Sequence, residues 1–535
     1  MSLGEEKRLS GTAVMVMFAT MLSRVTGFLR NVLIKNIMLP QGYSDEFIVA
    51  FSLPDLVFEL LVGGAIAAAI IPILASSLSK RNEEDGWKAI GTLLNITIIA
   101  VIILEMLFFI WTPDFVKLLA IGYEDGTKEF ALTVKLTRIL LPSAIFMILA
   151  GQCNGILNAY NKFAAVAFGP VVYNLCVVSS IIVFGGKNAE LTSWGVMFSA
   201  LIYFLMQLAF TLKHFKLYRP RLFLKNETFI RLVRLAVPSL LASAVWKVNT
   251  IITGSFSTVF AQNSVTVMNN ANRTWQLPLG IFAQSMGVTI LPALSSRYAE
   301  DRKDDYKRIL YKGIRTILIL CIPSTVVLMV LNRQIMQILF IWNDTVQSEV
   351  LLNGLALFAF APALLFQSVV VILNRAFYSI QNTRIPLISG IVAITANLAA
   401  NDYFIRHSEL GVAGTAMAFV IAVMVNAFIL IFMFSQKTGL MLIPENFDFL
   451  AKVSLAAVAA GVVLWAFTLV IPFPWEESYT IGKKIMEVLV VGLQFVFAFL
   501  TFVIIAVLLK IEEVRHLIGS VLARIKGLFN RRKYI

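Results

Sequence analysis

The chain has 535 residues, of which 59% are hydrophobic and only 14% charged, whereas soluble domains carry roughly 25% charged residues. This composition excludes an ordinary soluble enzyme and indicates a protein with many membrane-spanning segments. The net charge of +14 would suggest nucleic acid for a soluble protein, but here it must first be divided between the two sides of the bilayer.

Fourteen segments are long and apolar enough to cross a membrane, which takes about 20 residues. In chain order they are 11–38, 46–78, 89–111, 129–157, 163–185, 191–213, 229–258, 264–296, 309–331, 348–378, 385–405, 411–436, 449–472 and 482–510. We therefore predict an all-α polytopic membrane protein with 14 transmembrane helices. The first segment lacks the short apolar core and cleavage site of a signal peptide and is expected to stay as a helix.

Basic residues are concentrated in one set of connecting loops, which includes "KHFKLYRPRLFLKNETFIRLVR", "SRYAEDRKDDYKR" and the tail "RIKGLFNRRKYI". The opposite set contains few: Lys117, Lys128, Lys187, Arg333, Arg406, Lys483 and Lys484. Cytoplasmic loops carry the excess of lysine and arginine, so both termini are predicted to be cytoplasmic. This asymmetry accounts for most of the positive charge, and we expect no nucleic-acid partner.

The chain contains an internal repeat of about 220 residues. Matching pairs are Pro72 with Pro292, Pro142 with Pro362, and "ELTSWG" at 190–195 with "ELGVAG" at 409–414. Each repeat has six spans, an even number, so both enter the membrane in the same direction. Such parallel repeats are found in transporters that rock two lobes around a central site.

The repeat divides the chain into four predicted parts: an N-terminal six-helix lobe at 1–220, a second six-helix lobe at 221–440, two extra helices at 441–510, and an amphipathic basic tail at 511–535. The two lobes are expected to be related by a pseudo-two-fold axis along the membrane normal. The tail is expected to lie on the inner leaflet.

Positive charges occur inside the first span, where exposure to lipid would cost at least a few kcal/mol. The stretch "SRVTGFLRNVLIK" contains Arg24, Arg30 and Lys35. At about 100° per residue, Arg24, Asn31 and Lys35 fall within roughly 20° of one another, while Arg30 lies about 120° away. We expect Lys35 to snorkel to the outer interface and the two deeper arginines to line a cavity.

Two later spans add further groups of this kind. The span 229–258 contains Lys247 and Asn249, and the span 264–296 contains Arg273 in "NNANRTWQLP". Both repeats thus supply a cationic interior, which suits an anionic lipid because guanidinium groups pair bidentately with phosphate. Three acidic residues within spans are alternative partners that would make these charges structural: Asp55, Glu59 and Glu105.

These residues resemble those of the MurJ (MviN) lipid II flippases, in the multidrug/oligosaccharidyl-lipid/polysaccharide (MOP) exporter superfamily. The resemblance covers about residues 10–440 and is carried by "LSRVTGFLRNVLI", "DEFIVAFSLPDL", "GILNAYNKF", "NRTWQLPLGIFAQSMGVTILPALS" and "NRAFYSIQNTRIP". It implies flipping of undecaprenyl-pyrophosphate-linked peptidoglycan precursor from the inner to the outer leaflet of the bacterial cytoplasmic membrane. The family's essential arginines fall on Arg24, Arg30 and Arg273, and its two extra helices imply a groove for the lipid tail.

Several positions depart from the family pattern. Asn31 stands where an acid is frequent, Ser52 where a basic residue is usual, and Thr253 where some members carry an acid of a sodium site. Lys247 is a candidate to supply the positive charge that family members usually carry at the position of Ser52. The predicted substrate-binding set is Arg24, Arg30, Asn31, Ser52, Lys247, Asn249 and Arg273.

We expect no catalysis, cofactor or metal, and a monomer that binds lipid II and membrane lipids, with a coupling ion or the membrane potential as the energy source. Cys153, Cys176 and Cys321 lie in apolar runs and form neither a disulfide framework nor a metal pattern. Four alternatives stay open: a flippase for another polyprenyl-linked glycan such as O-antigen or capsule, a drug/cation antiporter, a polytopic glycosyl- or phosphotransferase, and a scaffold that does not transport.

Overall fold

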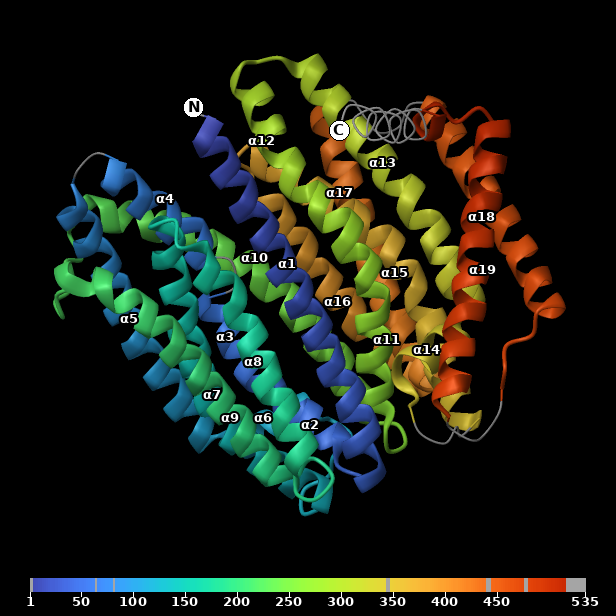
Figure 1. Cartoon of the computed structure of the whole chain (residues 1–535), viewed down its shortest axis with the longest axis horizontal. Helices are drawn as coiled ribbons and strands as arrows, with labels where there is room; N and C mark the ends of the chain where they lie inside the picture. Colours follow the sequence, from blue (N-terminus) through green and yellow to red (C-terminus); the bar gives the residue numbers. More distant parts are fainter. Residues whose placement is uncertain are drawn as a thin grey trace. The chain divides into compact units, whose positions relative to one another are not determined.

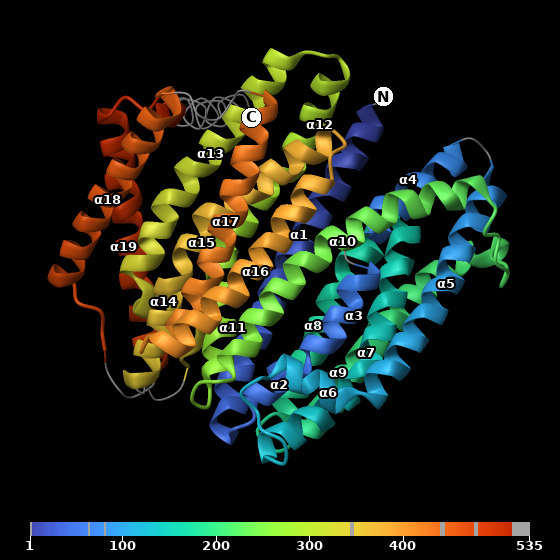
Figure 2. The same cartoon turned by 180° about the vertical axis from the view of Figure 1, so that it is seen from behind.

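The computed structural model describes residues 3–62, 65–79, 82–342, 347–438, 444–475 and 480–515. All regular structure within these ranges is helical. The chain divides into two compact units, Met1–Thr266 (unit 1) and Val267–Ile535 (unit 2), which are drawn in Figures 1 and 2.

Unit 1 contains ten α-helices and the start of an eleventh in its described residues. They are α1 (Leu3–Leu33), α2 (Ser44–Ala50), α3 (Ser52–Val62), α4 (Ala65–Ser79), α5 (Glu83–Ile110), α6 (Thr112–Leu119), α7 (Lys128–Ala159), α8 (Phe163–Phe184), α9 (Ala189–Thr211) and α10 (Glu227–Ser257). A π turn, η1 (Ile34–Met38), and a 3-10 turn, η2 (Leu39–Gln41), follow α1, and a 3-10 turn, η3 (Leu212–Leu217), follows α9.

The helices of unit 2 begin with most of α11 (Ser264–Leu279), whose first turn belongs to unit 1. They continue with the π turn η4 (Gly280–Gln284), α12 (Ser285–Ala299), α13 (Lys303–Val330), α14 (Asn332–Phe340), α15 (Gln347–Ser379), α16 (Arg384–His407), α17 (Val412–Thr438), α18 (Pro444–Val470) and α19 (Ile481–Leu508).

The helix boundaries repeat with the period expected from the sequence. Helix α5 begins at Glu83 and α13 at Lys303, which is 220 residues later. The same separation relates the first residues of α6 and α14, of α4 and α12, and of α2 and α11. The duplicated helix order is therefore present in the structure, including the short helices that follow the third span of each repeat.

Eleven helical segments in the described part of the chain are long and apolar enough to cross a membrane. They coincide with all of the predicted spans except 11–38, 46–78 and 229–258, which correspond to α1 with η1, to α2–α4, and to α10. These three segments carry most of the charged residues predicted to form the site. The total of fourteen membrane spans therefore remains a prediction.

The predicted span 46–78 is divided into three helices in the structure. Proline has no backbone N–H, so Pro54 cannot donate to the carbonyl of Ala50, and the chain turns between α2 and α3 at this place. Proline is tolerated in the first turn of a helix, and the amide of Asp55 donates to Phe51 O at 3.0 Å. The break places Asp55 in the first turn of α3.

Unit 1 is held together around α7, which packs against α3, α4, α5 and α9. Helices α5, α7 and α9 run side by side in both views (Figures 1 and 2). A hydrophobic core shared by α3, α5 and α7 includes Trp87 of α5, Leu141 and Ile148 of α7, and Leu53 of α3. Helix α10 packs against α3, α4 and α5, and α1 packs along α8.

The segment between α9 and α10 is fastened to α5. The Asp85 carboxylate accepts hydrogen bonds from Asn226 Nδ2 at 2.6 Å and Thr228 Oγ1 at 2.7 Å. About two to three turns further along α5, the amide of Phe223 donates to Thr92 Oγ1 at 3.0 Å, and the hydroxyl of Tyr218 donates to Asn95 Oδ1 at 2.6 Å. The beginning of α10 is thereby held in place.

Unit 2 carries the extra helices α18 and α19, which lie side by side in both views (Figures 1 and 2). Helix α18 packs against α13 through a core that includes Ile322, Phe449 and Val453. Ile511 and Val514, at the start of the predicted tail, are buried in the same core. The rest of the tail, 516–535, lies outside the described residues.

Candidate functional site

The predicted residues of α1 differ in their exposure. Arg24 is exposed and Arg30 is partly buried. Asn31 is buried, and its amide donates to Gly27 O on the same helix at 2.9 Å. The expected snorkelling of Lys35 is wrong, because only 1% of this residue is exposed. Lys35 lies in the π turn η1, which changes the angular spacing that an uninterrupted α-helix would have.

Four side chains of unit 1 form a charged cluster that we call the Asp55 cluster: Arg30, Asp55, Tyr173 and Lys247. The ammonium of Lys247 lies 2.9 Å from Asp55 Oδ2. Arg30 and the Asp55 carboxylate both lie within electrostatic range of the Tyr173 hydroxyl. The cluster therefore draws on α1, α3, α8 and α10 and contains two cations and one carboxylate.

Two other predicted residues lie close to this cluster along the chain. Ser52 is partly buried at the start of α3, three residues before Asp55, and therefore on the same face of the helix. Asn249 is 5% exposed on α10, and its carbonyl accepts a hydrogen bond from Thr253 Oγ1 at 3.2 Å. The position that lacks a basic residue, Ser52, is thus one helical turn from the carboxylate that holds Lys247.

Arg273 lies on α11 in unit 2, with an exposed side chain. Its Nε donates to Asn269 Oδ1, one turn earlier, at 3.2 Å. The neighbouring Trp275 is fully buried, and its ring packs against those of Phe360 and Phe419. The buried tryptophan fixes the rotation of α11 about its axis and so directs Arg273 outward.

Tyr173 is a site residue that sequence reasoning missed. It lies in an apolar span, "FGPVVYNLCVV", where a tyrosine gives no signal of its partner. The neighbouring Asn174 donates to Ser23 O at 3.2 Å and lies against Gly27, where an added Cβ would be 3.3 Å from Asn174 Nδ2. The small residue at position 27 thus permits the close approach of α1 and α8 that brings Tyr173 to Arg30.

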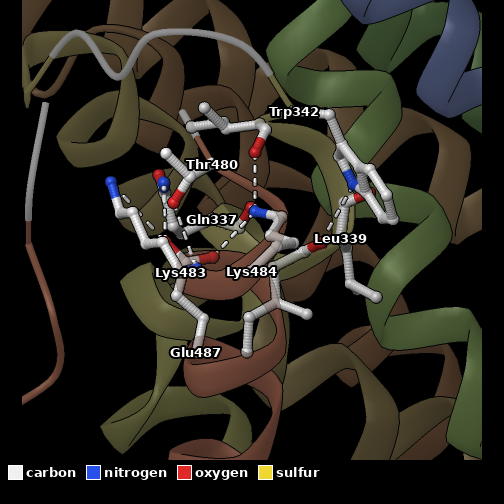
Figure 3. Close-up of polar contacts among 9 residues, drawn as sticks. Gln337, Leu339, Trp342, Thr480, Lys483, Lys484 and Glu487 are labelled. Atoms are coloured by element: carbon white, nitrogen blue, oxygen red, sulfur yellow. Dashed lines mark hydrogen bonds and ion pairs between the residues drawn. The ribbon is translucent and has the colours of Figure 1, made fainter. Parts of the chain in front are cut away.

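A second polar cluster in unit 2 was not expected from the sequence, which placed Lys483 and Lys484 among the loop charges. Lys484 is 6% exposed in the first turn of α19, and its ammonium donates to Gln337 O at 2.8 Å and Ile341 O at 2.6 Å (Figure 3). It also lies 2.8 Å from Glu487 Oε2. A side chain of α19 therefore caps the carboxyl end of α14.

The described residues contain no group of three or more histidine, cysteine, aspartate or glutamate side chains able to hold a metal ion. The predicted site residues are instead mainly cations, and these cations lie on helices α1, α10 and α11. The family described as "Lipid II flippase MurJ" matches residues 34–477. The chain belongs to the MurJ lipid II flippase family.

Relatives in the MurJ family match most of the chain. A "Probable lipid II flippase MurJ" of Vibrio cholerae is 28% identical over 475 residues, which cover 86% of this chain and 89% of that protein. A "Lipid II flippase MurJ" of Burkholderia cenocepacia is 26% identical over 467 residues, covering 85% and 89% respectively.

Solved structures show the same fold. A "Lipid II flippase MurJ, inward closed conformation" has a TM-score of 0.75 at 22% identity and covers 94% of this chain and 100% of its own. A multidrug resistance MATE family transporter of the MOP superfamily, in an inward-facing conformation, has a TM-score of 0.65 at 15% identity, covering 80% and 98%. The fold is therefore that of the MurJ and MATE transporters.

Proposed function

We propose that this chain moves lipid II, the polyprenyl-pyrophosphate-linked precursor of peptidoglycan, from the cytoplasmic to the periplasmic leaflet of the bacterial inner membrane. The observation that carries this proposal is its membership of the MurJ family over residues 34–477. The relatives that bear the name lipid II flippase match more than four fifths of the chain.

The cations of the two units supply the chemistry for binding the headgroup. Pyrophosphate offers several anionic oxygens, and guanidinium groups bind such oxygens in pairs. Arg24 and Arg273 have exposed side chains, while Arg30 and Lys247 belong to the Asp55 cluster. In this mechanism the arginines hold the pyrophosphate while the two repeats alternate access, and no covalent bond forms or breaks.

The polyprenyl tail remains in lipid during this movement. The helices α18 and α19 expose many large apolar side chains, among them Leu455, Trp465, Leu489 and Phe499, and we assign the tail to this pair. The distribution of lysine and arginine among the loops places both termini in the cytoplasm. The membrane potential, worth about 2.3 kcal/mol per charge per 100 mV, could act directly on the cations of the site.

The experiment is lipid II binding to purified full-length protein by native mass spectrometry, with an O-antigen-type polyprenyl-pyrophosphate lipid as competitor. We expect wild type to prefer lipid II, and Arg24→Ala, Arg30→Ala and Arg273→Ala each to bind at least about tenfold less, as loss of a charge-assisted pair predicts. Arg308→Ala, at an exposed position of α13, is the matched control. Equal binding by all variants would make the arginines structural, and a preference for the competitor would change the substrate.

A further inference from the structure

The ion pair between Asp55 and Lys247 joins two of the predicted spans, 46–78 and 229–258. The side chain of Lys247 is 22% exposed and that of Asp55 is 54% exposed. A charged pair facing lipid at this depth would be costly, so the open side of the pair is suited to a polar ligand. The carboxylate is the more accessible of the two partners.

The pair also joins the two sequence repeats. Helix α3 belongs to the first repeat, whereas α10 follows residue 220 and belongs to the second. Both helices pack together within unit 1. The ion pair adds a polar connection to this packing, and a partly exposed ion pair is a weak contact that can be exchanged.

A pyrophosphate is a stronger partner for an ammonium than a single carboxylate is, because it brings more than one negative charge and several acceptor oxygens. Arg30, which lies within electrostatic range of Tyr173 in the same cluster, adds a second cation. An anion that reaches this cluster therefore meets two cations whose charge is partly neutralised by one displaceable carboxylate.

We propose that Asp55 is an internal counterion that holds Lys247 in the empty protein and is displaced from it by the pyrophosphate of the lipid headgroup. This inference rests on the proposed function and deepens it. Displacement breaks the ion pair between α3 and α10, so binding of the headgroup removes one polar connection between the two repeats. Asp55 then repels the anion and favours its departure once the headgroup has been delivered.

The test is a double-mutant cycle on the full-length protein, with lipid II affinity measured for wild type, Asp55→Asn, Lys247→Met and the double variant. We expect Asp55→Asn to bind lipid II about tenfold more tightly, since the ligand no longer competes with a partly exposed ion pair. In the Lys247→Met background the same substitution should change affinity less than about threefold, because the carboxylate then no longer pairs with the Lys247 ammonium. Flipping by Asp55→Asn should be slower despite the tighter binding, which a merely structural residue would not produce.

Two controls separate this effect from general charge and from misfolding. Glu190→Gln removes a carboxylate that pairs with Lys135 at 2.6 Å elsewhere in unit 1, and it should leave affinity unchanged. Asp55→Glu keeps the counterion and should bind as wild type does, while thermal unfolding shows whether each variant is folded.

If wild type and folded Asp55→Asn bind lipid II with the same affinity, the counterion role is overturned and the proposed function is left intact. An equal gain in affinity with and without Lys247 would also overturn it, since the carboxylate would then act as a general repulsive charge. If wild type binds no polyprenyl-pyrophosphate lipid, both the proposed function and this inference are overturned.

Discussion

The ammonium of Lys484 lies 2.8 Å from the main-chain oxygen of Gln337, which is 147 residues earlier in the chain. The last carbonyls of a helix have no partner within the helix, and a cation at this end also interacts favourably with the helix dipole. Lys484 shares the Gln337 oxygen with the amide of Ile341, donates also to Ile341 O just past the end of α14, and pairs with Glu487, which is 1% exposed. This contact ties the beginning of α19 to α14.

We expect Lys484→Met to destabilise the protein strongly. The substitution keeps the length of the side chain but leaves Glu487 buried without its closest cation, and the free-energy cost of breaking a buried pair is about 3–5 kcal/mol. Thermal unfolding of the protein in nanodiscs would measure this cost. The double variant Lys484→Met/Glu487→Met should recover part of the lost stability, because no charge is then left unpaired.

The matched control for this prediction is Lys452→Met on α18. Lys452 pairs with Asp448 at 2.5 Å, but both side chains are exposed and lie one turn apart, so the loss should be at most about 0.5 kcal/mol. If Lys484→Met and Lys452→Met unfold at the same temperature, the buried pair does not stabilise unit 2.

The start of α11 depends on a carboxylate from α2. Asp45 Oδ1 accepts hydrogen bonds from the amide of Thr266 at 2.8 Å and from its hydroxyl at 2.5 Å, and Oδ2 accepts one from the amide of Val265 at 3.2 Å. A carboxylate at this end of a helix satisfies free amides and complements the dipole. We expect Asp45→Ala to cost about 1–2 kcal/mol and to speed hydrogen exchange at Val265 and Thr266.

Asp304→Ala is the control for the capping prediction. Asp304 also lies in the first turn of a helix, α13, but its side chain is exposed, so the cost should be at most about 1 kcal/mol. Unchanged exchange at the two amides of α11 in Asp45→Ala would mean that the carboxylate does not hold this helix end.

The sequence predicted the helices of this fold well, because the length of an apolar run and the place of a proline are local properties. The repeat of about 220 residues predicted that the span of α13 would correspond to that of α5, and the helix boundaries agree. Pro54 predicted an interruption of the span 46–78, because proline removes a backbone hydrogen bond, and the structure has a break between α2 and α3 there. Hydropathy alone gave a single span where the structure has three helices, because it does not measure backbone hydrogen bonds.

The environments of the charged residues were harder to predict. Lys35 and Lys484 both lie near the ends of spans, where a lysine is usually assigned to the interface, yet both are buried. The partners of Lys484 include carbonyl oxygens of Gln337 and Ile341 at the end of α14, and no pattern in the sequence marks these oxygens as its acceptors. Asp55 was one of three possible counterions in the sequence, and the structure shows its pairing with Lys247.

The segment that precedes α10 should become more accessible when its attachment to α5 is removed. Asp85→Ala eliminates the acceptor of Asn226 and Thr228, and the neighbouring basic residues 213–225 are potential trypsin sites. We expect cleavage there to be several times faster than in wild type, because local opening exposes the backbone to the protease. Asp402→Ala, which removes only an exposed partner of Arg406 at 2.7 Å, should leave the rate unchanged. Equal cleavage of Asp85→Ala and wild type would show that the other contacts with α5 are sufficient to hold the segment.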